Sequence, residues 1–326
     1  MRAMVLDRPG GRFELQDIPV PEPGAGEALV QVVACGVCRT DLHVVDGDIT
    51  DGRYPVVPGH QIVGRVVRAP AGSALAVGQR IGIPWLGYTC GECGYCRSGR
   101  ENLCDRAEFT GYQRPGGYAE FVAVDERFCF PLPEGYPDAQ AAPLLCAGLI
   151  GYRALSMAGD ALRIGFYGFG NAAHILTQIA AWQGRRVYAF TRDGDDETQA
   201  FARRLGACWA GGSSAAPPEP LDAAILFAPA GELVPRALTH VVKGGSVICA
   251  GIHMSEIPAF PYALLWGERT LRSVANLTRA DGRALLELAP RAGVHTEVQT
   301  FPLERTADAL AALREGRING AAVVTV

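Results

Sequence analysis

The chain has 326 residues, of which 48% are hydrophobic and 20% are charged, a composition typical of globular proteins. Its formal net charge is -4, which argues against a nucleic-acid partner or an anionic membrane surface. We see neither a signal-peptide pattern nor an apolar run of about 18 residues, so we expect a cytoplasmic protein with no membrane span. At roughly 100–200 residues per domain, this length predicts two domains.

The first part of the chain predicts a compact β-rich domain. Residues 29–34 and 62–68 are short runs rich in β-branched side chains, and Gly and Pro bound them. From about Gly148 strands alternate with helices, which is typical of a doubly wound parallel sheet. The elements expected there are strands over residues 163–167, 186–190, 221–227 and 246–251, and helices over residues 172–182 and 197–205.

The last segment returns to a strand, a helix and a strand, which we expect over residues 294–298, 305–313 and 321–326. We expect this segment to rejoin the first domain. The pattern therefore predicts a first domain over residues 1–147, completed by residues 289–326, and an α/β domain over residues 148–288.

Four cysteines crowd into one loop at the spacing C-x2-C-x2-C-x7-C: Cys90, Cys93, Cys96 and Cys104. Zinc suits four thiolate ligands, and a closed shell of four leaves no open position for chemistry, so we expect a structural zinc site. An iron–sulfur cluster also takes four cysteines. Four unconnected thiols or a nucleic-acid zinc ribbon are the other interpretations, and the acidic chain disfavours the ribbon.

Three segments that lie far apart in the chain offer a second set of zinc ligands. Cys38 opens the sequence CRTDLH, His60 follows a Pro-Gly pair, and Cys146 precedes the α/β pattern. Two cysteines and one histidine form a catalytic zinc set in which water or substrate takes the fourth position. Taken singly, Cys146 would be a core thiol and His60 a loop histidine, and spacing alone does not show that the segments converge.

Residues 168–173, GFGNAA, read G-x-G-x-x-A between an expected strand and an expected helix. Gly168 permits the sharp turn, Gly170 lets the backbone approach a pyrophosphate, and Ala173 permits close helix–strand packing. The N–H groups at the start of the helix, where Asn171 stands, attract phosphates. This context predicts a dinucleotide site.

The residue that contacts the adenosine ribose in such a site lies about twenty residues further on. A carboxylate there favours NAD, but this chain has Thr191 followed by Arg192. A hydroxyl and a guanidinium can accommodate a 2′-phosphate, so we expect NADP to be favoured over NAD. The alternative is a solvated Arg192, with Asp193 binding the ribose instead.

Together these motifs resemble the zinc-dependent medium-chain alcohol dehydrogenases, over essentially the whole chain. The segments that carry the resemblance follow the family's order: C-x-T-D-x-H at residues 38–43, a Gly-His motif at residues 59–64, the four-cysteine lobe, G-G-Y-A-E at residues 116–120, Cys146 and the dinucleotide turn. The resemblance implies a GroES-like catalytic domain and a Rossmann cofactor domain. It also implies homodimers or homotetramers.

The resemblance implies two zinc ions per chain. Cys38, His60 and Cys146 would hold the catalytic ion, and the four-cysteine lobe would hold the structural one. One position departs from the family, because Gln61 stands where a glutamate usually follows the ligand histidine. An amide carries no negative charge, so we expect a more positive zinc site.

The resemblance also implies roles for the neighbours of the zinc ligands. Asp41 would orient His60, Thr40 would hydrogen-bond the alcohol oxygen, and His43 would end a proton relay to solvent. The other implied positions are Arg39 near the cofactor pyrophosphate and Trp85 in the substrate pocket. The apolar side chains of Trp85 and Leu86 suggest that this pocket is apolar.

The sequence therefore predicts a zinc-dependent alcohol dehydrogenase. It would move hydride reversibly between a primary or secondary alcohol and NAD(P)+, giving an aldehyde or ketone, with zinc as the Lewis acid. A zinc-free quinone or enoyl reductase of the same fold is one alternative, but it would lack the Cys/His/Cys set. A non-catalytic zinc protein, such as a redox sensor, is the other, and the dinucleotide turn speaks against it.

Overall fold

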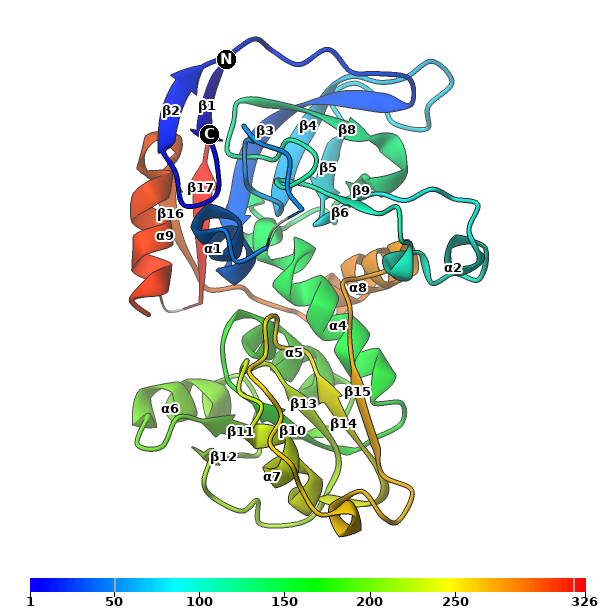
Figure 1. Ribbon diagram of the computed structural model, residues 1–326, viewed down its shortest axis with the longest axis vertical. Coiled ribbons are helices and arrows are strands. Elements are labelled where there is room, and N and C mark those ends of the chain that lie inside the picture. The colour runs from blue at the N-terminus through cyan, green and yellow to red at the C-terminus, as the bar shows by residue number, and fades with distance from the viewer. Residues whose placement is uncertain (50, 319) are drawn as a thin grey trace. The chain divides into compact units, whose positions relative to one another are not determined.

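The computed structural model describes residues 1–49, 51–318 and 320–326, which form two compact units (Figure 1). Unit 1 comprises Met1–Cys146, Asn276–Glu287 and His295–Val326, and unit 2 comprises Ala147–Ala275 and Leu288–Val294. In the described part of the chain, no helix has the length and apolar character needed to cross a membrane.

Unit 1 is built on a seven-stranded sheet with the order β16-β17-β3-β4-β5-β9, in which β8 also pairs with β3. Two small sheets, β1-β2 and β6-β7, complete its strands. The strands are β1 (Arg2–Leu6), β2 (Phe13–Asp17), β3 (Glu27–Val37), β4 (Ile62–Arg68), β5 (Arg80–Ile83), β6 (Leu86–Tyr88), β7 (Glu108–Phe109), β8 (Phe121–Asp125), β9 (Phe130–Pro131), β16 (Val298–Pro302) and β17 (Ala321–Thr325). The helices are α1 (Arg39–Asp46), α2 (Gly94–Arg97), α3 (Asp138–Ala141), α8 (Arg279–Arg291, shared with unit 2) and α9 (Thr306–Arg314).

Strand β3 organises unit 1 because it pairs with three neighbours and leads directly to the candidate metal ligands. Ala28, Val30 and Val32 alternate toward the core, as a half-buried strand requires. The last four residues of β3 are all buried, where β17 and β4 flank it on either side. The 3-10 turns in the described residues are η1 (Glu101–Leu103), η2 (Glu126–Phe128), η3 (Ala142–Leu145), η4 (Tyr262–Leu264, in unit 2) and η5 (Leu303–Arg305).

Unit 2 is a parallel six-stranded sheet with the order β12-β11-β10-β13-β14-β15, the doubly wound Rossmann order. Its strands are buried along nearly their whole length at the centre of the sheet, in residues 163–167, 186–191 and 221–226, because helices cover both faces there. They are β10 (Arg163–Tyr167), β11 (Arg186–Thr191), β12 (Trp209–Gly212), β13 (Leu221–Leu226), β14 (Val241–Cys249) and β15 (Thr270–Ser273). The helices are α4 (Ala147–Met157), α5 (Asn171–Trp182), α6 (Asp196–Arg204) and α7 (Leu233–His240).

The expected fold class, a GroES-like β-rich domain with a Rossmann domain, is confirmed, but one expected strand is wrong. The sequence predicts a strand over residues 294–298, whereas β16 begins at Val298. Three polar residues separate Val294 from Val298, and two more follow Val298, so the pattern does not mark where pairing starts. Pairing starts where β17 begins, with Val298 opposite Ala321, and just before it the hydroxyl of Thr296 donates to the carbonyl oxygen of Gln140 at 2.7 Å.

Candidate active site and metal centres

Cys38, His60 and Cys146 converge in unit 1, with their ligand atoms all within 4.8 Å of one another. The two sulfurs are 3.8 Å apart, and Nε2 of His60 lies 3.3 Å from Sγ of Cys38 and 3.4 Å from Sγ of Cys146. Zinc–sulfur bonds of about 2.3 Å and zinc–nitrogen bonds of about 2.0 Å, set tetrahedrally, give edges of about 3.5–3.8 Å. The three groups therefore fit a tetrahedral ion with one open position.

The sheet of unit 1 brings these ligands together. Cys38 follows β3 and His60 precedes β4, which is the antiparallel neighbour of β3, so the two ligands leave the sheet at the same end. Cys146 follows η3, which packs on β5: a Cβ at Gly82 would lie 2.5 Å from Cδ2 of Leu145. The glycine therefore allows the turn that carries the third ligand to approach the sheet closely.

Asp41 contacts two of the three candidate ligands, His60 and Cys38. Its Oδ1 lies 3.0 Å from Nδ1 of His60, and its Oδ2 accepts the backbone N–H of Cys38 at 2.8 Å. Burial lowers the pKa of His60, but the charges of Asp41 and Cys38 outweigh burial and raise that pKa to about 10. The same arrangement turns Nε2 toward the two sulfurs, as a metal-ligating histidine requires, and a bound cation would displace the imidazole proton there.

Helix α1 carries three further residues that the sequence assigned to the site. Thr40 is buried, and its backbone N–H donates to Sγ of Cys38 at 3.4 Å, which favours the thiolate at the helix N-terminus. His43 lies one turn later, with Nδ1 2.7 Å from a carboxylate oxygen of Asp48. Arg39 is exposed. The structure thus places Thr40 beside a ligand and His43 at a partly exposed position on the same helix.

An aromatic wall adjoins His60. The Trp85 ring meets the His60 ring edge-on at 5.0 Å, and it stacks on Phe109 at 5.0 Å and Tyr112 at 6.0 Å. Sequence reasoning missed Phe109 and Tyr112, for which the aromatic pair just after the cysteine lobe was the available signal. Leu86, in contrast, is fully buried in β6, so its side chain belongs to the core and not to an accessible pocket.

The four cysteines of the lobe form the second candidate metal centre, with all four sulfurs within 4.8 Å of one another. Sγ of Cys90 lies 3.5 Å from that of Cys104 and 3.8 Å from that of Cys96. The backbone amide of Glu92 is the largest of the causes that lower the pKa of Cys90 to about 6. Thiolate sulfurs that accept N–H groups and stand at tetrahedral edge lengths fit a closed four-thiolate metal site.

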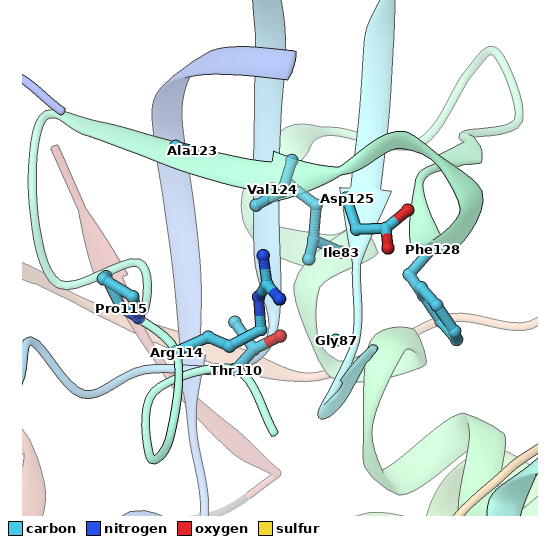
Figure 2. A pocket seen from close by; sticks show the side chains of 9 residues that line it. All are labelled: Ile83, Gly87, Thr110, Arg114, Pro115, Ala123, Val124, Asp125 and Phe128. Carbon is cyan, nitrogen blue, oxygen red and sulfur yellow. The ribbon is translucent and has the colours of Figure 1, made fainter. Parts of the chain in front are cut away.

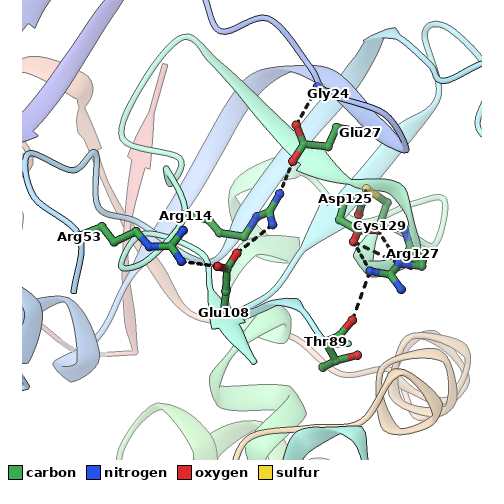
Figure 3. Close-up of polar contacts among 9 residues, drawn as sticks. All are labelled: Gly24, Glu27, Arg53, Thr89, Glu108, Arg114, Asp125, Arg127 and Cys129. Carbon is green, nitrogen blue, oxygen red and sulfur yellow. Dashed lines mark hydrogen bonds and ion pairs between the residues drawn. The ribbon is translucent and has the colours of Figure 1, made fainter. Parts of the chain in front are cut away.

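Ion pairs hold the polypeptide around the lobe in place (Figure 3). Arg127 pairs with Asp125 at 2.6 Å and donates to the carbonyl oxygen of Thr89 at 3.3 Å, directly before the first lobe cysteine. Arg114 bridges Glu27 and Glu108 in the same unit. These contacts tie the loops at Thr89 and Arg114 to neighbouring strands and to η2.

The match to known proteins extends over the whole chain. Residues 24–134 match the family described as "Alcohol dehydrogenase GroES-like domain". A "Probable alcohol dehydrogenase AdhA" of Mycobacterium tuberculosis (strain CDC 1551 / Oshkosh) is 45% identical over 339 residues, covering 100% of this chain and 97% of that protein. This chain belongs to the zinc-type medium-chain alcohol dehydrogenase family. The family expected from the motifs is thereby confirmed, and the chain is an oxidoreductase.

Other known proteins also match this chain over its full length. An "Alcohol dehydrogenase" of Geobacillus stearothermophilus is 33% identical, covering 100% of each chain. Among solved structures, an acetophenone reductase from Geotrichum candidum in complex with NAD has a TM-score of 0.89 and 27% identity, with 100% of this chain and 97% of that chain covered.

In this alcohol dehydrogenase family member, the glycine turn has the geometry expected for a dinucleotide site. Gly168 has φ +88°, and a Cβ there would lie 2.7 Å from the backbone nitrogen of Ala228. A Cβ at Gly170 would meet nothing described within 4 Å, so the turn is open on that side. Ala173 is fully buried in α5, and Asn171 is the first residue of that helix.

The end of β11 carries the residues expected to contact the adenosine ribose. The environment of the Thr191 hydroxyl differs from the expectation. Thr191 is buried, and its hydroxyl donates to the carbonyl oxygen of Arg192 at 2.9 Å and accepts from Gln199 at 3.2 Å. The hydroxyl is therefore engaged inside the protein. Arg192 is exposed, and it forms no ion pair with any residue described.

Two cavities of unit 1 have linings that include none of the candidate metal ligands. The first has a volume of about 10 Å³, room for one water molecule, and Figure 2 shows Arg114, Asp125 and Thr110 around it. The second, of about 690 Å³, is lined by residues that include Arg65, Arg80 and Tyr136. The first is too small for a substrate, and the residues that line the second include none of the metal-ligand candidates.

Proposed function

We propose that this protein is a zinc-dependent alcohol dehydrogenase that interconverts a small alcohol and its aldehyde or ketone, with NADP favoured over NAD. It would hold two zinc ions per chain, a catalytic one on Cys38, His60 and Cys146 and a structural one in the four-cysteine lobe. The family resemblance adds a homodimer or homotetramer to the proposal.

One observation carries the proposal: two sulfurs and one imidazole nitrogen stand 3.3–3.8 Å apart. Among the described residues, no fourth cysteine, histidine or carboxylate joins this group, which leaves one tetrahedral position open. A structural site would close that position, as the four-cysteine lobe does, whereas a catalytic site keeps it for substrate. A zinc ion held there would act as a Lewis acid on an alcohol or carbonyl oxygen.

The residues of the chain would orient the ligands and move the proton. Asp41 keeps the proton of His60 on Nδ1, so Nε2 is free to bind the metal. Thr40 would accept the alcohol proton through its hydroxyl, since it stands beside Cys38. His43, on the same helix and beside Asp48, would pass the proton to solvent. The ring of Trp85 next to His60 would cover an apolar substrate group.

The cofactor part of the proposal rests on the chain's own residues. The acetophenone reductase from Geotrichum candidum was solved with NAD. In this chain the end of β11 carries Thr191 and the exposed Arg192 in place of a carboxylate, which supports binding of a 2′-phosphate.

Metal content and activity of matched variants test the proposal. We expect two zinc ions per chain in the wild type by elemental analysis, and one in Cys38→Ser, which should also lose at least 1,000-fold in alcohol-dependent reduction of NADP, by loss of the Lewis acid. Cys208→Ser, at an exposed cysteine, is the control and should keep both ions and full activity. A Cys38→Ser variant with two ions, or with wild-type activity, would overturn the proposal.

A further inference from the structure

Arg236, on α7, reaches the end of β11 from a different crossover. Its Nη1 donates to the carbonyl oxygen of Ser213 at 2.7 Å, and the backbone N–H of Ser213 in turn donates to the carbonyl oxygen of Thr191 at 2.8 Å. Arg236 is exposed, and among the residues described no carboxylate pairs with it. Arg236 is therefore a second guanidinium without a carboxylate partner among the described residues. It is linked through Ser213 to the end of β11, where Arg192 stands.

The peptide unit between Ser213 and Ser214 also binds the carboxylate of Asp193, which would otherwise be available to the ribose. The N–H of Ser214 donates to Oδ1 of Asp193 at 3.0 Å, while the carbonyl of the preceding residue accepts from Arg236. This backbone hydrogen bond is the largest cause that lowers the pKa of Asp193, and the charge of Arg236 adds to it. Gly212 makes room for the carboxylate, since a Cβ there would lie 2.2 Å from Oδ1 of Asp193.

The charge balance at this strand end makes the second guanidinium significant. Asp195 and Asp196 follow at the start of α6, and Asp195 accepts the N–H of Thr198 at 3.0 Å. With Arg192 as the only cation, a phosphate here would meet more negative than positive charge, which would oppose its binding. Two guanidiniums on separate elements are the arrangement that grips a phosphate dianion through several charge-assisted hydrogen bonds.

We propose that Arg236 and Arg192 together form the subsite for the 2′-phosphate of NADP, so that Arg236 is a specificity-determining residue. This inference rests on the proposed preference for NADP. The carbonyl oxygen of Ser213 orients the Arg236 side chain, and the N–H of Ser214 binds Asp193. The hydroxyl of Thr191 is engaged inside the protein and does not contact the phosphate in this arrangement.

Binding of two adenine nucleotides to the holoenzyme tests the inference without relying on turnover. The probes are 2′,5′-ADP, which carries the 2′-phosphate, and 5′-AMP, which lacks it, and titration calorimetry gives both dissociation constants. Loss of a charge-assisted contact predicts roughly 10-fold weaker binding of 2′,5′-ADP to Arg236→Gln, with 5′-AMP binding unchanged. Arg236→Lys keeps the charge and should lie between the two proteins.

Arg204→Gln is the matched control, because Arg204 is exposed at the opposite end of α6, and it should bind both probes as the wild type does. A wild type that prefers 2′,5′-ADP and an Arg236→Gln variant with the same preference would overturn the inference and leave the NADP preference standing. Equal weakening of both probes in Arg236→Gln would also overturn it, because that result indicates a structural role. A wild type without any preference would overturn both the inference and the NADP preference.

Discussion

The side chain of Gln61 lies against the backbone of Gly36, in the strand that leads to Cys38. The backbone N–H of Gly36 donates to the backbone carbonyl oxygen of Gln61 at 3.0 Å. A Cβ at Gly36 would lie 2.7 Å from the side-chain oxygen Oε1 of Gln61. The amide is fully buried, and neither Oε1 nor Nε2 has a hydrogen-bond partner among the residues described. A buried amide in this state costs stability, because it has lost its water without replacement.

Replacing Gln61 by Met should therefore stabilise the protein. The side chain keeps its length and loses two polar atoms, and we expect a gain of about 1–3 kcal/mol in the free energy of unfolding. At roughly 2–4 °C per kcal/mol for a unit of this size, calorimetry should record a higher melting temperature. Gln199→Met is the matched control and should be destabilised, since Gln199 is buried with a partner, Thr191. A lower melting temperature for Gln61→Met would mean that the amide has a partner in solution.

Asp41→Asn should weaken the metal centre without abolishing it. The carboxylate accepts from both His60 and Cys38, so the variant loses the charge that holds Nδ1–H and the orientation of the ring. Loss of such a partner costs about 10–100-fold in metal affinity. Competition with a chromophoric chelator should therefore release one ion per chain earlier than in the wild type.

Asp46→Asn is the control for this experiment, because Asp46 lies at the other end of α1 and pairs with Arg314 at 2.5 Å. It should hold both ions as tightly as the wild type does. If Asp41→Asn also released both ions at wild-type chelator concentrations, the orienting role of Asp41 would be wrong.

Glu101 ties the cysteine lobe to helix α8, and its removal should destabilise the protein in a pH-dependent way. Its Oε1 accepts the backbone N–H of Arg279 at 3.0 Å and Nε of the same residue at 3.2 Å. Burial raises the pKa of Glu101, but these hydrogen bonds outweigh burial and hold the pKa below its ordinary value of 4.5. A carboxyl with a depressed pKa stabilises the folded state above pH 4.5, and that stabilisation is lost as the pH falls through the folded-state pKa.

We therefore expect Glu101→Gln to lose about 1–3 kcal/mol at pH 7, with the difference from the wild type shrinking below pH 4.5. Urea unfolding across this pH range measures it. Glu92→Gln removes an exposed ion pair with Arg106 in the same lobe and should cost less than about 1 kcal/mol at any pH. A Glu101→Gln loss that stayed constant with pH would show that the carboxylate charge is not what matters.

The features that the sequence predicted well are local, or are motifs whose residues follow a characteristic spacing. The glycine turn after β10 and the cysteine lobe are each contained in one short segment, and the strand–turn–helix pattern fixes their context. Cys38 and His60 were found because adjoining residues form a family motif. Their convergence with Cys146 is a tertiary fact, and only the family resemblance, not the spacing, anticipated it.

The features that sequence did not predict depend on partners that are remote in the chain. The hydroxyl of Thr191 accepts a hydrogen bond from Gln199, which lies on the next helix. Arg236 reaches the same strand end from α7, with no motif to connect them. Leu86 is apolar whether it lines a pocket or the core, so its full burial in β6 could not be read from its identity.

The two glycines of the dinucleotide turn should respond differently to the same substitution. Gly168→Ala places a Cβ at φ +88° and within 2.8 Å of two atoms of Ala228, so we expect a loss of about 1–3 kcal/mol in stability. Gly170→Ala meets no described atom within 4 Å and has φ -110°, so its stability should stay within about 0.5 kcal/mol of the wild type. Its methyl group would instead occupy the space that the pyrophosphate needs, and binding of NADPH, followed by fluorescence, should weaken at least 10-fold. Unchanged NADPH affinity in a well-folded Gly170→Ala would mean that the open side of the turn does not face the pyrophosphate.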